Sequence, residues 1–527
     1  MRMKTMSRSM EHDLQRRRLL MAGAGLFGLS LAGRSLRLLA APKFNADPFS
    51  LGVASGDPSE DGFVIWTRLA PDPVNGGGMP DAAVEVEWWV AEDEQFRKVV
   101  QRGTALAQPE WAHSIHVEVA GLKPHRVYWY RFRVADAQSP VGRSQTLPMS
   151  NTSMDRLRLA FVSCQHFEQG WYTAYRDIAG QDLDVVIHLG DYIYERHHRR
   201  GAVREHLIDE PKTLTEYRNH HAQYKSDPDL RAAHARFPWI VTWDDHDVQN
   251  DYAGIYPPDT TPQEQFMLRR AAAYQAYYEH LPLRLRSRPL GGDALMYRSF
   301  AFGTLAQMQV TDERQYRSDQ PCGVAGYLGG QVTLDCEERN DPTRTMFGAE
   351  QERWLMQGLA SSRKRWNIVA QQLLMAQLDE RRGDQRAWWT DGWDGYPAAR
   401  RRLLDHLNYQ KIRNCVVLGG DAHSFYACDL KPDFDDGNSP VVASEFTGTS
   451  VTSDPGGPYE YFKAMLPYNP YIRYFESRYR GYVRCDVTPK EWRTDFVGVE
   501  DIKDPQSATR VLQKFVVEPG RPGVQTA

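Results

Sequence analysis

The sequence predicts an α/β protein that carries an all-β sandwich domain on its N-terminal side. Between residues 44 and 150, short apolar or alternating runs recur about every ten residues with no helix between them, which is typical of a small β-sandwich. From 155 to 505, uniformly apolar runs alternate with helical stretches, which indicates a catalytic-sized domain with a covered sheet. Residues 506–527 form a C-terminal tail whose amphipathic piece is expected to pack over the cleft or on the sandwich.

Each expected element has its own local signal. Turn clusters at 76–78 and 121–124 separate the strands of the sandwich. In the α/β domain a helix is expected to begin near Thr261, because Thr261 and Glu264 have the spacing of a capping box and Pro262 falls in the first turn. The expected strands are 63–68, 84–90, 114–119 and 126–132 in the sandwich, and 158–163, 183–189, 366–370 and 415–418 in the α/β domain.

The composition excludes several classes of protein. The 527 residues are 41% hydrophobic and 25% charged, which argues against disorder and against a multi-span membrane protein. Lys plus Arg number 64 and Asp plus Glu number 68, and this near balance predicts no nucleic-acid-binding surface. Six cysteines are too few for a disulfide scaffold. Cys322 and Cys336 flank a Gly-rich loop, and we expect them to form a disulfide outside the cytoplasm.

Residues 1–41 have the pattern of an export signal. Three arginines at 16–18 precede an apolar run from 19 to 32, and small residues follow. The run is well short of the ~20 residues that a bilayer span needs, so no stable membrane anchor is predicted. The string 16–21 resembles a twin-arginine signal. This resemblance implies the twin-arginine translocase as a partner during export and a periplasmic or secreted location.

Polar side chains follow four of the expected strands at the point where each strand ends. Taken singly, each of these segments fits an ordinary turn or cap. Together they offer carboxylate, imidazole, phenol and thiol groups at the sheet edge where α/β proteins bind ligands. This set suits a binuclear site with at least one hard cation such as ferric iron, and two metals can activate water against a phosphate ester. The four segments are 163–166, 190–195, 243–247 and 419–423.

Two arginines are candidates for direct contact with a phosphate group. A basic segment at 196–204 follows the second strand end, and it fits either a solvated loop or an anion-attracting rim. Arg204 is the first candidate, and Arg314, after another apolar run, is the second. The reason is that a guanidinium fork matches the geometry of phosphate oxygens.

Several blocks of the chain resemble the alkaline phosphatase D (PhoD-like) family of the calcineurin-like metallophosphoesterase superfamily. Residues 51–57, 66–68 and 445–450 are similar to stretches of the family outside its active site. The likeness spans nearly the whole chain after the signal, and it implies a layered αββα catalytic domain behind the N-terminal sandwich. The blocks that resemble the family's active site are, in order, 161–164, 190–195, 243–246 and 420–423.

The resemblance also implies which residues hold the first metal. Cys164 would bind ferric iron in place of the superfamily's usual Asp–x–His start. Tyr194 would be the phenolate ligand of the iron, and His423 would close that side. Asp191 would bridge the two metals.

The second metal is implied to be calcium. Asp245 and Asp421 would bind it, because calcium accepts carboxylate oxygens at several coordination numbers. The superfamily's remaining histidine has no counterpart near 370–372, so the shell of this metal is incomplete. His246 would touch the phosphate or the leaving group.

The sequence therefore predicts a secreted alkaline phosphatase that hydrolyses phosphomonoesters and phosphodiesters by attack of metal-activated water. A phospholipase-type phosphodiesterase on the same site is the near alternative. An exported iron redox protein is the alternative of another class, although the chain has no dinucleotide-binding glycine pattern and no clustered cysteines for an iron–sulfur centre. A binding protein with an inactive site is disfavoured by the nearly complete set of ligands.

Overall fold

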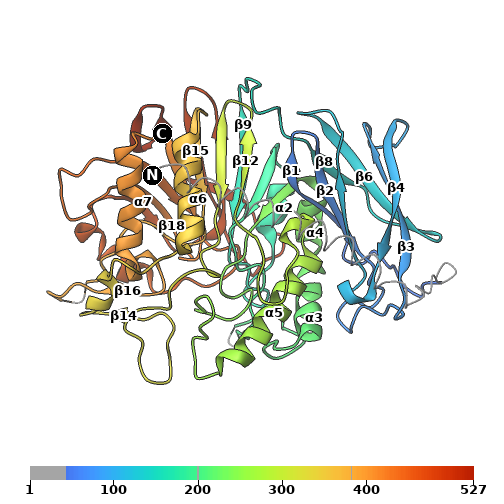
Figure 1. The fold of residues 1–527 in the computed structure, drawn as a ribbon, viewed down its shortest axis with the longest axis horizontal. Helices are drawn as coiled ribbons and strands as arrows, with labels where there is room; N and C mark the ends of the chain where they lie inside the picture. Colours follow the sequence, from blue (N-terminus) through green and yellow to red (C-terminus); the bar gives the residue numbers. More distant parts are fainter. Residues whose placement is uncertain (1–42, 199–200, 382) are drawn as a thin grey trace, which may run out of the picture.

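Two β-sheets pack face to face and carry helices on their outer faces (Figure 1). The computed structural model describes residues 43–198, 201–381 and 383–527. The predicted export signal at 1–41 lies outside the described residues. Within them, no helix combines the length and the apolar character that a bilayer crossing requires. The four layers confirm the predicted αββα architecture.

The first sheet has ten strands in the order β24-β23-β22-β21-β9-β10-β11-β1-β2-β5. Its centre is parallel, since β10 pairs in parallel with both β9 and β11. Every residue of β10 is buried, as expected for a strand covered on both faces. The strands are β1 (Val53–Ser59), β2 (Gly62–Arg68), β5 (Ser114–Val119), β9 (Leu157–Val162), β10 (Val185–His188), β11 (Pro238–Val241), β21 (Arg480–Val487), β22 (Trp492–Val499), β23 (Thr509–Glu518) and β24 (Arg521–Thr526).

The second sheet has seven strands in the order β12-β13-β15-β17-β19-β18-β20. Its four central strands run parallel. Apolar side chains of both sheets, such as Phe161, Ile187, Ile368 and Leu418, form one buried cluster between them. The strands are β12 (Arg298–Phe302), β13 (Ala306–Val310), β15 (Trp366–Ala370), β17 (Cys415–Gly419), β18 (Phe425–Leu430), β19 (Ala443–Thr447) and β20 (Ile472–Glu476).

Helices cover the outer face of each sheet. Helices α2 (Thr173–Gly180), α3 (Leu214–Lys225), α4 (Pro228–Arg236) and α5 (Gln263–His280) contribute to the apolar cluster on the ten-stranded sheet. On the opposite side of the molecule, at the left of Figure 1, α6 (Gly348–Ser361) and α7 (Pro397–Tyr409) cover the seven-stranded sheet.

The predicted helix near Thr261 is confirmed, but its predicted capping box is wrong. Helix α5 begins at Gln263 after Pro262, and no side chain caps it. The Asp259 carboxylate instead accepts from the Thr261 backbone N–H at 2.9 Å, so the polar turn lies just before the helix. A capping box is present in α3, between Thr213 and Glu216.

The N-terminal sandwich shares a sheet with the α/β region. A five-stranded sheet packs on β1, β2 and β5, with Phe63, Val86 and Tyr130 in the core between them. Strand β1 also pairs in parallel with β11, so the sandwich is continuous with the ten-stranded sheet. The strands of the five-stranded sheet, blue at the right of Figure 1, are β3 (Val84–Ala91), β4 (Val99–Ala107), β6 (Val127–Val134), β7 (Ala137–Gln138) and β8 (Gly142–Gln145).

The remaining elements are short. Strands β14 (Val332–Thr333) and β16 (Trp388–Trp389) form a two-stranded sheet, and α8 spans Tyr459–Lys463. The predicted disulfide between Cys322 and Cys336 is present. The 3₁₀ helices are η1 (Pro109–Trp111), η2 (Leu285–Ser287), η3 (Glu337–Asn340), η4 (Trp393–Gly395) and η5 (Leu466–Tyr468).

The C-terminal tail lies elsewhere than expected. Residues 509–526 form β23 and β24, which extend the ten-stranded sheet beyond β22. Phe515 and Val517 enter the core between the two sheets, so the amphipathic pattern is that of a sheet strand.

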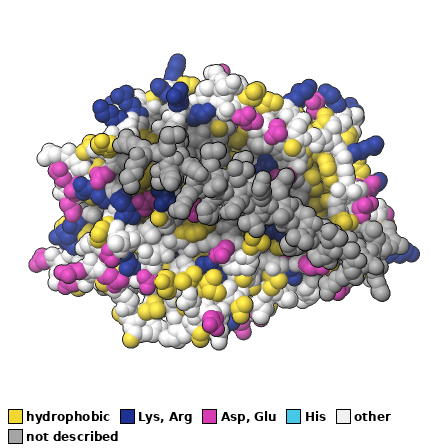
Figure 2. All heavy atoms as spheres, in the orientation of Figure 1, with side chains coloured by type: hydrophobic (Ala, Val, Ile, Leu, Met, Phe, Trp, Pro, Cys, Tyr) yellow, Lys and Arg dark blue, Asp and Glu magenta, His cyan; other side chains and the backbone are white. Residues whose placement is uncertain are grey.

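On the face shown in Figure 2, Lys and Arg side chains are interspersed with Asp and Glu, in keeping with the formal charge of −4.

Candidate metal centre

Four loops meet where parallel strands of the two sheets end. Cys164 follows β9, Asp191 follows β10 and Asp245 follows β11, three neighbouring strands of the ten-stranded sheet. Asp421 and His423 follow β17 of the seven-stranded sheet. The candidate site therefore uses the carboxyl ends of strands from both layers, as ligand sites of layered α/β proteins do.

A first group of ligand atoms gathers around Asp191. One ligand atom from each of Cys164, Asp191 and His423 lies within 4.8 Å of the others. The Tyr194 hydroxyl donates to Asp191 Oδ2 at 2.8 Å and lies 3.0 Å from His423 Nε2. The structure thus brings all four residues expected on the iron side into one cluster.

A second group shares Asp191 with the first. Carboxylate oxygens of Asp191, Asp244, Asp245 and Asp421 lie within 4.8 Å of one another. Because Asp191 belongs to both groups, it occupies the position that a bridging ligand needs. Asp244 carries no predicted role, although it stands beside Asp245 in the same polar run.

A third group extends the oxygen-rich side. Carboxylate oxygens of Asp245, Asp251 and Asp391 lie within 4.8 Å of one another. Burial, together with the charge of Asp391, raises the pKa of Asp251 to about 7. Sequence reasoning missed Asp251 and Asp391, and Asp391 stands at no expected strand end.

The backbone at these loops adopts an uncommon conformation. Four of the predicted ligands have positive φ angles: 59° at Cys164, 56° at Asp191, 57° at Asp421 and 48° at His423. Such conformations cost free energy for residues other than glycine, and they persist where surrounding contacts impose them. At these four positions the positive φ angles belong to residues whose side chains converge on the candidate site.

Asp247 holds two of the loops in place. Its carboxylate accepts hydrogen bonds from the backbone N–H groups of Asp191, Tyr192, Ile193 and Asp244, at 2.9–3.2 Å. Burial raises the pKa of Asp247 to about 7, although these four amides oppose the shift. Asp247 therefore ties the loop after β10 to the loop after β11, a role that no local sequence pattern indicates.

The acidic cluster is short of positive charge. Asp191, Asp244 and Asp245 are buried, and Asp421 is half-buried. Burial raises the pKa of Asp191 and Asp244 well above the usual range, with the neighbouring carboxylates adding to the effect. Bound cations would reverse both shifts, because a metal ion stabilises the carboxylates that coordinate it.

His246 is positioned by a buried carboxylate. Its Nδ1 lies 2.6 Å from Glu195 Oε2, and the other oxygen of Glu195 accepts from the Asn250 backbone N–H at 2.9 Å. Burial by itself lowers the pKa of His246, but Glu195, Asp191 and Asp245 raise it well above its usual value. Glu195 closes the 190–195 block, yet its contact with His246 could not be read from the sequence.

The two arginines expected to contact phosphate bind protein groups. Arg204 donates to Asp227 at 2.6 Å and to the carbonyls of Phe167 and Gly170. Arg314 is fully buried, bonds Asp244, and donates to Asp391 at 2.9 Å. These contacts give Arg204 a structural setting and Arg314 the role of counter-charge to the acidic cluster, so they lend no support to direct phosphate contact.

A pocket of about 580 Å³ opens onto the clustered ligands. Asp191, Asp245, His246, Asp421 and His423 all contribute to its lining. The pocket therefore gives a substrate access to residues of both ligand groups. Its remaining lining is largely apolar and comes from the segments around β16 and α8.

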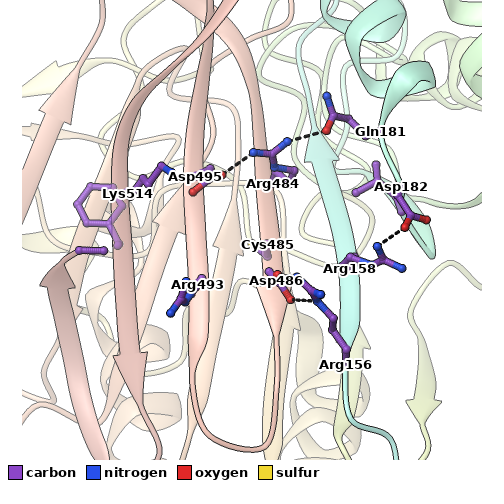
Figure 3. A pocket seen from close by; sticks show the side chains of 13 residues that line it. Arg156, Arg158, Gln181, Asp182, Arg484, Cys485, Asp486, Arg493, Asp495 and Lys514 are labelled. Atoms are coloured by element: carbon purple, nitrogen blue, oxygen red, sulfur yellow. Dashed lines mark hydrogen bonds and ion pairs between the residues drawn. The ribbon is translucent and has the colours of Figure 1, made fainter.

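A second depression lies on the outer face of β9, β21, β22 and β23; we call it the strand-face concavity (Figure 3). Its volume is about 360 Å³, and two ion pairs in its lining join neighbouring strands. Arg156 bonds Asp486, and Arg484 donates to Asp495 at 2.6 Å. None of the residues that line it is a predicted site residue.

Comparison with known proteins first identifies the class. The family model described as PhoD-like phosphatase matches residues 159–496. The model of the N-terminal domain of PhoD-like phosphatases matches residues 35–148. The protein is a phosphoric ester hydrolase.

Two relatives then narrow the assignment. Alkaline phosphatase D of Bacillus subtilis (strain 168) is 46% identical over 531 residues, which cover 98% of this chain and 90% of that protein. The solved structure entitled "Structure of PhoD" superposes with a TM-score of 0.89 at 46% identity, covering 92% of this chain and 93% of that one. The chain therefore belongs to the PhoD-like phosphatase family.

Proposed function

We propose that this chain is an alkaline phosphatase that hydrolyses phosphomonoesters and phosphodiesters at a site of one ferric iron and calcium. The observation that carries the proposal is that Asp191 belongs both to the group with Cys164 and His423 and to a group of carboxylates alone. One group offers sulfur, nitrogen and oxygen donors, and the other offers carboxylate oxygens alone. Such a pairing suits two unlike metals that share one carboxylate.

The donor set of the first group fits ferric iron. Burial raises the pKa of the Cys164 thiol well above its ordinary value, and the charges of Asp191 and Asp421 add to this. Burial likewise raises the pKa of Tyr194. A cation of high charge is what would hold a buried thiolate and phenolate side by side, because it offsets the desolvation of both anions.

The donor set of the second group fits calcium. Asp245 and Asp421, together with Asp191 and the newly found Asp244, supply oxygen ligands only. Calcium accepts six to eight oxygens at flexible angles, which suits four carboxylates carried on three separate loops. Four carboxylates already serve this side, so the proposal does not depend on the counterpart missing near 370–372.

The residues around the metals have separate tasks in hydrolysis. When bound, the metals would activate a water molecule and neutralise the charge on phosphate oxygens. Glu195 fixes the orientation of His246 through Nδ1, which leaves Nε2 as the nitrogen able to donate a proton to the leaving oxygen. Arg314 offsets charge beneath the cluster, in place of the phosphate contact expected of it.

The proposal is tested by assaying purified protein with p-nitrophenyl phosphate and bis-p-nitrophenyl phosphate at alkaline pH. We expect both to be cleaved, and we expect removal of calcium by a chelator to abolish cleavage until calcium is restored. Activity that survives complete calcium removal would reject the calcium assignment. A phospholipase-type activity on the same site is separated by including a phospholipid, and membership of a phosphatase family favours hydrolysis over the redox alternative.

We also propose that the folded protein leaves the cytoplasm through the twin-arginine translocase. The support is the string at 16–21 with the short apolar run that follows it. Replacing the three arginines at 16–18 by lysine should retain the active enzyme inside the cell. Undiminished export of that variant would reject the proposal.

A further inference from the structure

The pocket at the metal ligands continues into an apolar region. Its whole volume of about 580 Å³ lies within the ~300–1,000 Å³ typical of sites that enclose organic ligands, so it holds more than a phosphate group. We call the apolar region the apolar arm. It is lined by Leu374, Leu378, Trp389, Trp393, Tyr461 and Phe462.

Several side chains of the apolar arm remain open to solvent. Trp389 and Tyr461 are each 36% exposed, and Leu374, Leu378 and Phe462 are half-buried. Burying such side chains in the core would stabilise the fold by removing apolar surface from water. A cluster left open beside a charged site is typical of a ligand-binding surface.

The wall of the apolar arm is held in position by its neighbours. Trp389 lies in β16 and covers Gly330, where an added Cβ would meet the indole at 2.7 Å. The Trp393 indole N–H donates to Gln371 at 3.1 Å. Phe462 contacts the ring of Tyr461, with centroids 5.2 Å apart. A wall fixed in this way loses little conformational entropy when a ligand binds.

The charges around the apolar arm disfavour an anionic occupant. Among the described residues that line the pocket, none is a lysine or an arginine. Asp394, the carboxylate beside Trp393, already accepts from Arg400 at 2.8 Å and from the Leu378 backbone N–H at 2.8 Å. A second phosphate in the arm would meet carboxylates and would find no lysine or arginine among the described lining residues to bind it.

From these observations we propose that the apolar arm binds the uncharged, apolar or aromatic organic group of the phosphate ester whose phosphate lies on the metal ligands. The inference rests on the proposed function and specifies its substrate class. Esters of aliphatic or aromatic alcohols are preferred to esters that carry further phosphates. The enzyme distinguishes substrates in the arm, while the metal ligands bind the phosphate group that all of them share.

The test uses p-nitrophenyl alkyl phosphates with methyl, butyl and hexyl groups, which share one leaving group. We expect kcat/KM to rise about threefold for each methylene, slightly less than complete burial of a CH₂ would give. Choline p-nitrophenyl phosphate and an ester with a second phosphate should fall below the butyl ester. A flat alkyl series, or a preference for either charged ester, would overturn the inference.

Variants locate the effect in the apolar arm. Tyr461→Ala and Leu378→Asn should each lower the hexyl-to-methyl ratio of kcat/KM at least tenfold and leave inhibition by inorganic phosphate within twofold. The matched control is Tyr468→Ala, since Tyr468 lies in the same segment, is 51% exposed and does not line the pocket. If the hexyl-to-methyl ratio of kcat/KM is unchanged in both arm variants, or falls equally in the control, the proposal that the apolar arm binds the organic group is rejected. A metal-loaded protein that cleaves no ester at all would instead reject the proposed function.

Discussion

Two concavities of this molecule hold charged side chains in opposite ways. In the strand-face concavity, Arg156 bonds Asp486 and Arg484 bonds Asp495, and water reaches both pairs (Figure 3). In the pocket at the metal ligands, clustered carboxylates outnumber the guanidinium groups beside them, and all of those carboxylates except Asp421 are buried.

The comparison distinguishes charged side chains that pair with each other at the surface from buried carboxylates that need a bound cation. An exposed pair is solvated and changes the free energy of folding by about 0–1 kcal/mol. A buried carboxylate without a partner costs far more, so a fold retains several of them only when something else offsets the cost. Two bound cations would offset this cost. This is why the pocket at the metal ligands is the candidate active site and the strand-face concavity is not.

The largest effect is expected at Asp191, the residue shared by both ligand groups. Asp191→Asn removes the shared charge and should lower kcat/KM for p-nitrophenyl phosphate at least ~10³-fold, about 4 kcal/mol of transition-state stabilisation. The assay must be run at saturating iron and calcium. Activity within tenfold of the unmodified enzyme would mean that the two groups do not act as one site.

Arg314 should matter more for stability than for binding of phosphate. Arg314→Met leaves Asp244 without its ion-pair partner and should lower the free energy of unfolding of the metal-free protein by about 3 kcal/mol. This loss is at the low end of the range for breaking a buried ion pair. The reason is that Asp391, the second partner of Arg314, keeps Arg317 at 3.3 Å. The measurement is denaturant unfolding in the presence of a chelator.

The same variant also tests the phosphate contact first expected of Arg314. The counter-charge role predicts that the inhibition constant of phosphate for metal-loaded enzyme changes less than about threefold, below the ~1.4 kcal/mol that a tenfold change represents. A loss of phosphate affinity with unchanged stability would instead support direct contact between Arg314 and phosphate.

Glu195 should act through His246. Glu195→Gln removes the largest of the charges that oppose burial in setting the pKa of His246. That pKa then falls, and the high-pH limb of the rate profile, where His246 loses its proton, should move to lower pH. The rate should fall about 10²-fold for an alkyl phosphate and much less for a nitrophenyl phosphate, whose leaving group needs no proton. An equal loss of rate for both esters would mean that Glu195 has only a structural role.

The smallest effect is expected in the strand-face concavity. Asp486→Asn removes the partner of Arg156, whose side chain is 57% exposed, and should change the free energy of unfolding by less than about 1 kcal/mol. Phosphatase activity should stay unchanged. A marked loss of activity would show that this concavity contributes to function and would break the distinction drawn above.

The sequence predicted the strands that carry the site because their signals are local. Apolar runs at 158–163 and 366–370 correspond to β9 and β15, and polar groups at strand ends marked the four converging loops. The pairing of β1 with β11 joins residues far apart in the chain, so no local pattern contains it. The place of the tail in the ten-stranded sheet was missed for the same reason.

The site was predicted unevenly for a related reason. Residues at strand ends, such as Cys164 and Asp191, were found because their position itself is a signal. Asp247 and Asp391 were missed because their importance lies in the groups they contact across the fold. Arg204 was proposed from the basic segment around it and from the fork shape of its guanidinium, and its partner Asp227 becomes its neighbour only when the helical layer is packed.

The most direct test of the account is to count iron and calcium per chain in purified protein and in the Asp191→Asn variant. The account predicts one iron and at least one calcium in the unmodified protein, and a loss of both metals together in the variant, because one carboxylate serves both. Fully active protein without iron, or a variant that keeps both metals, would contradict it.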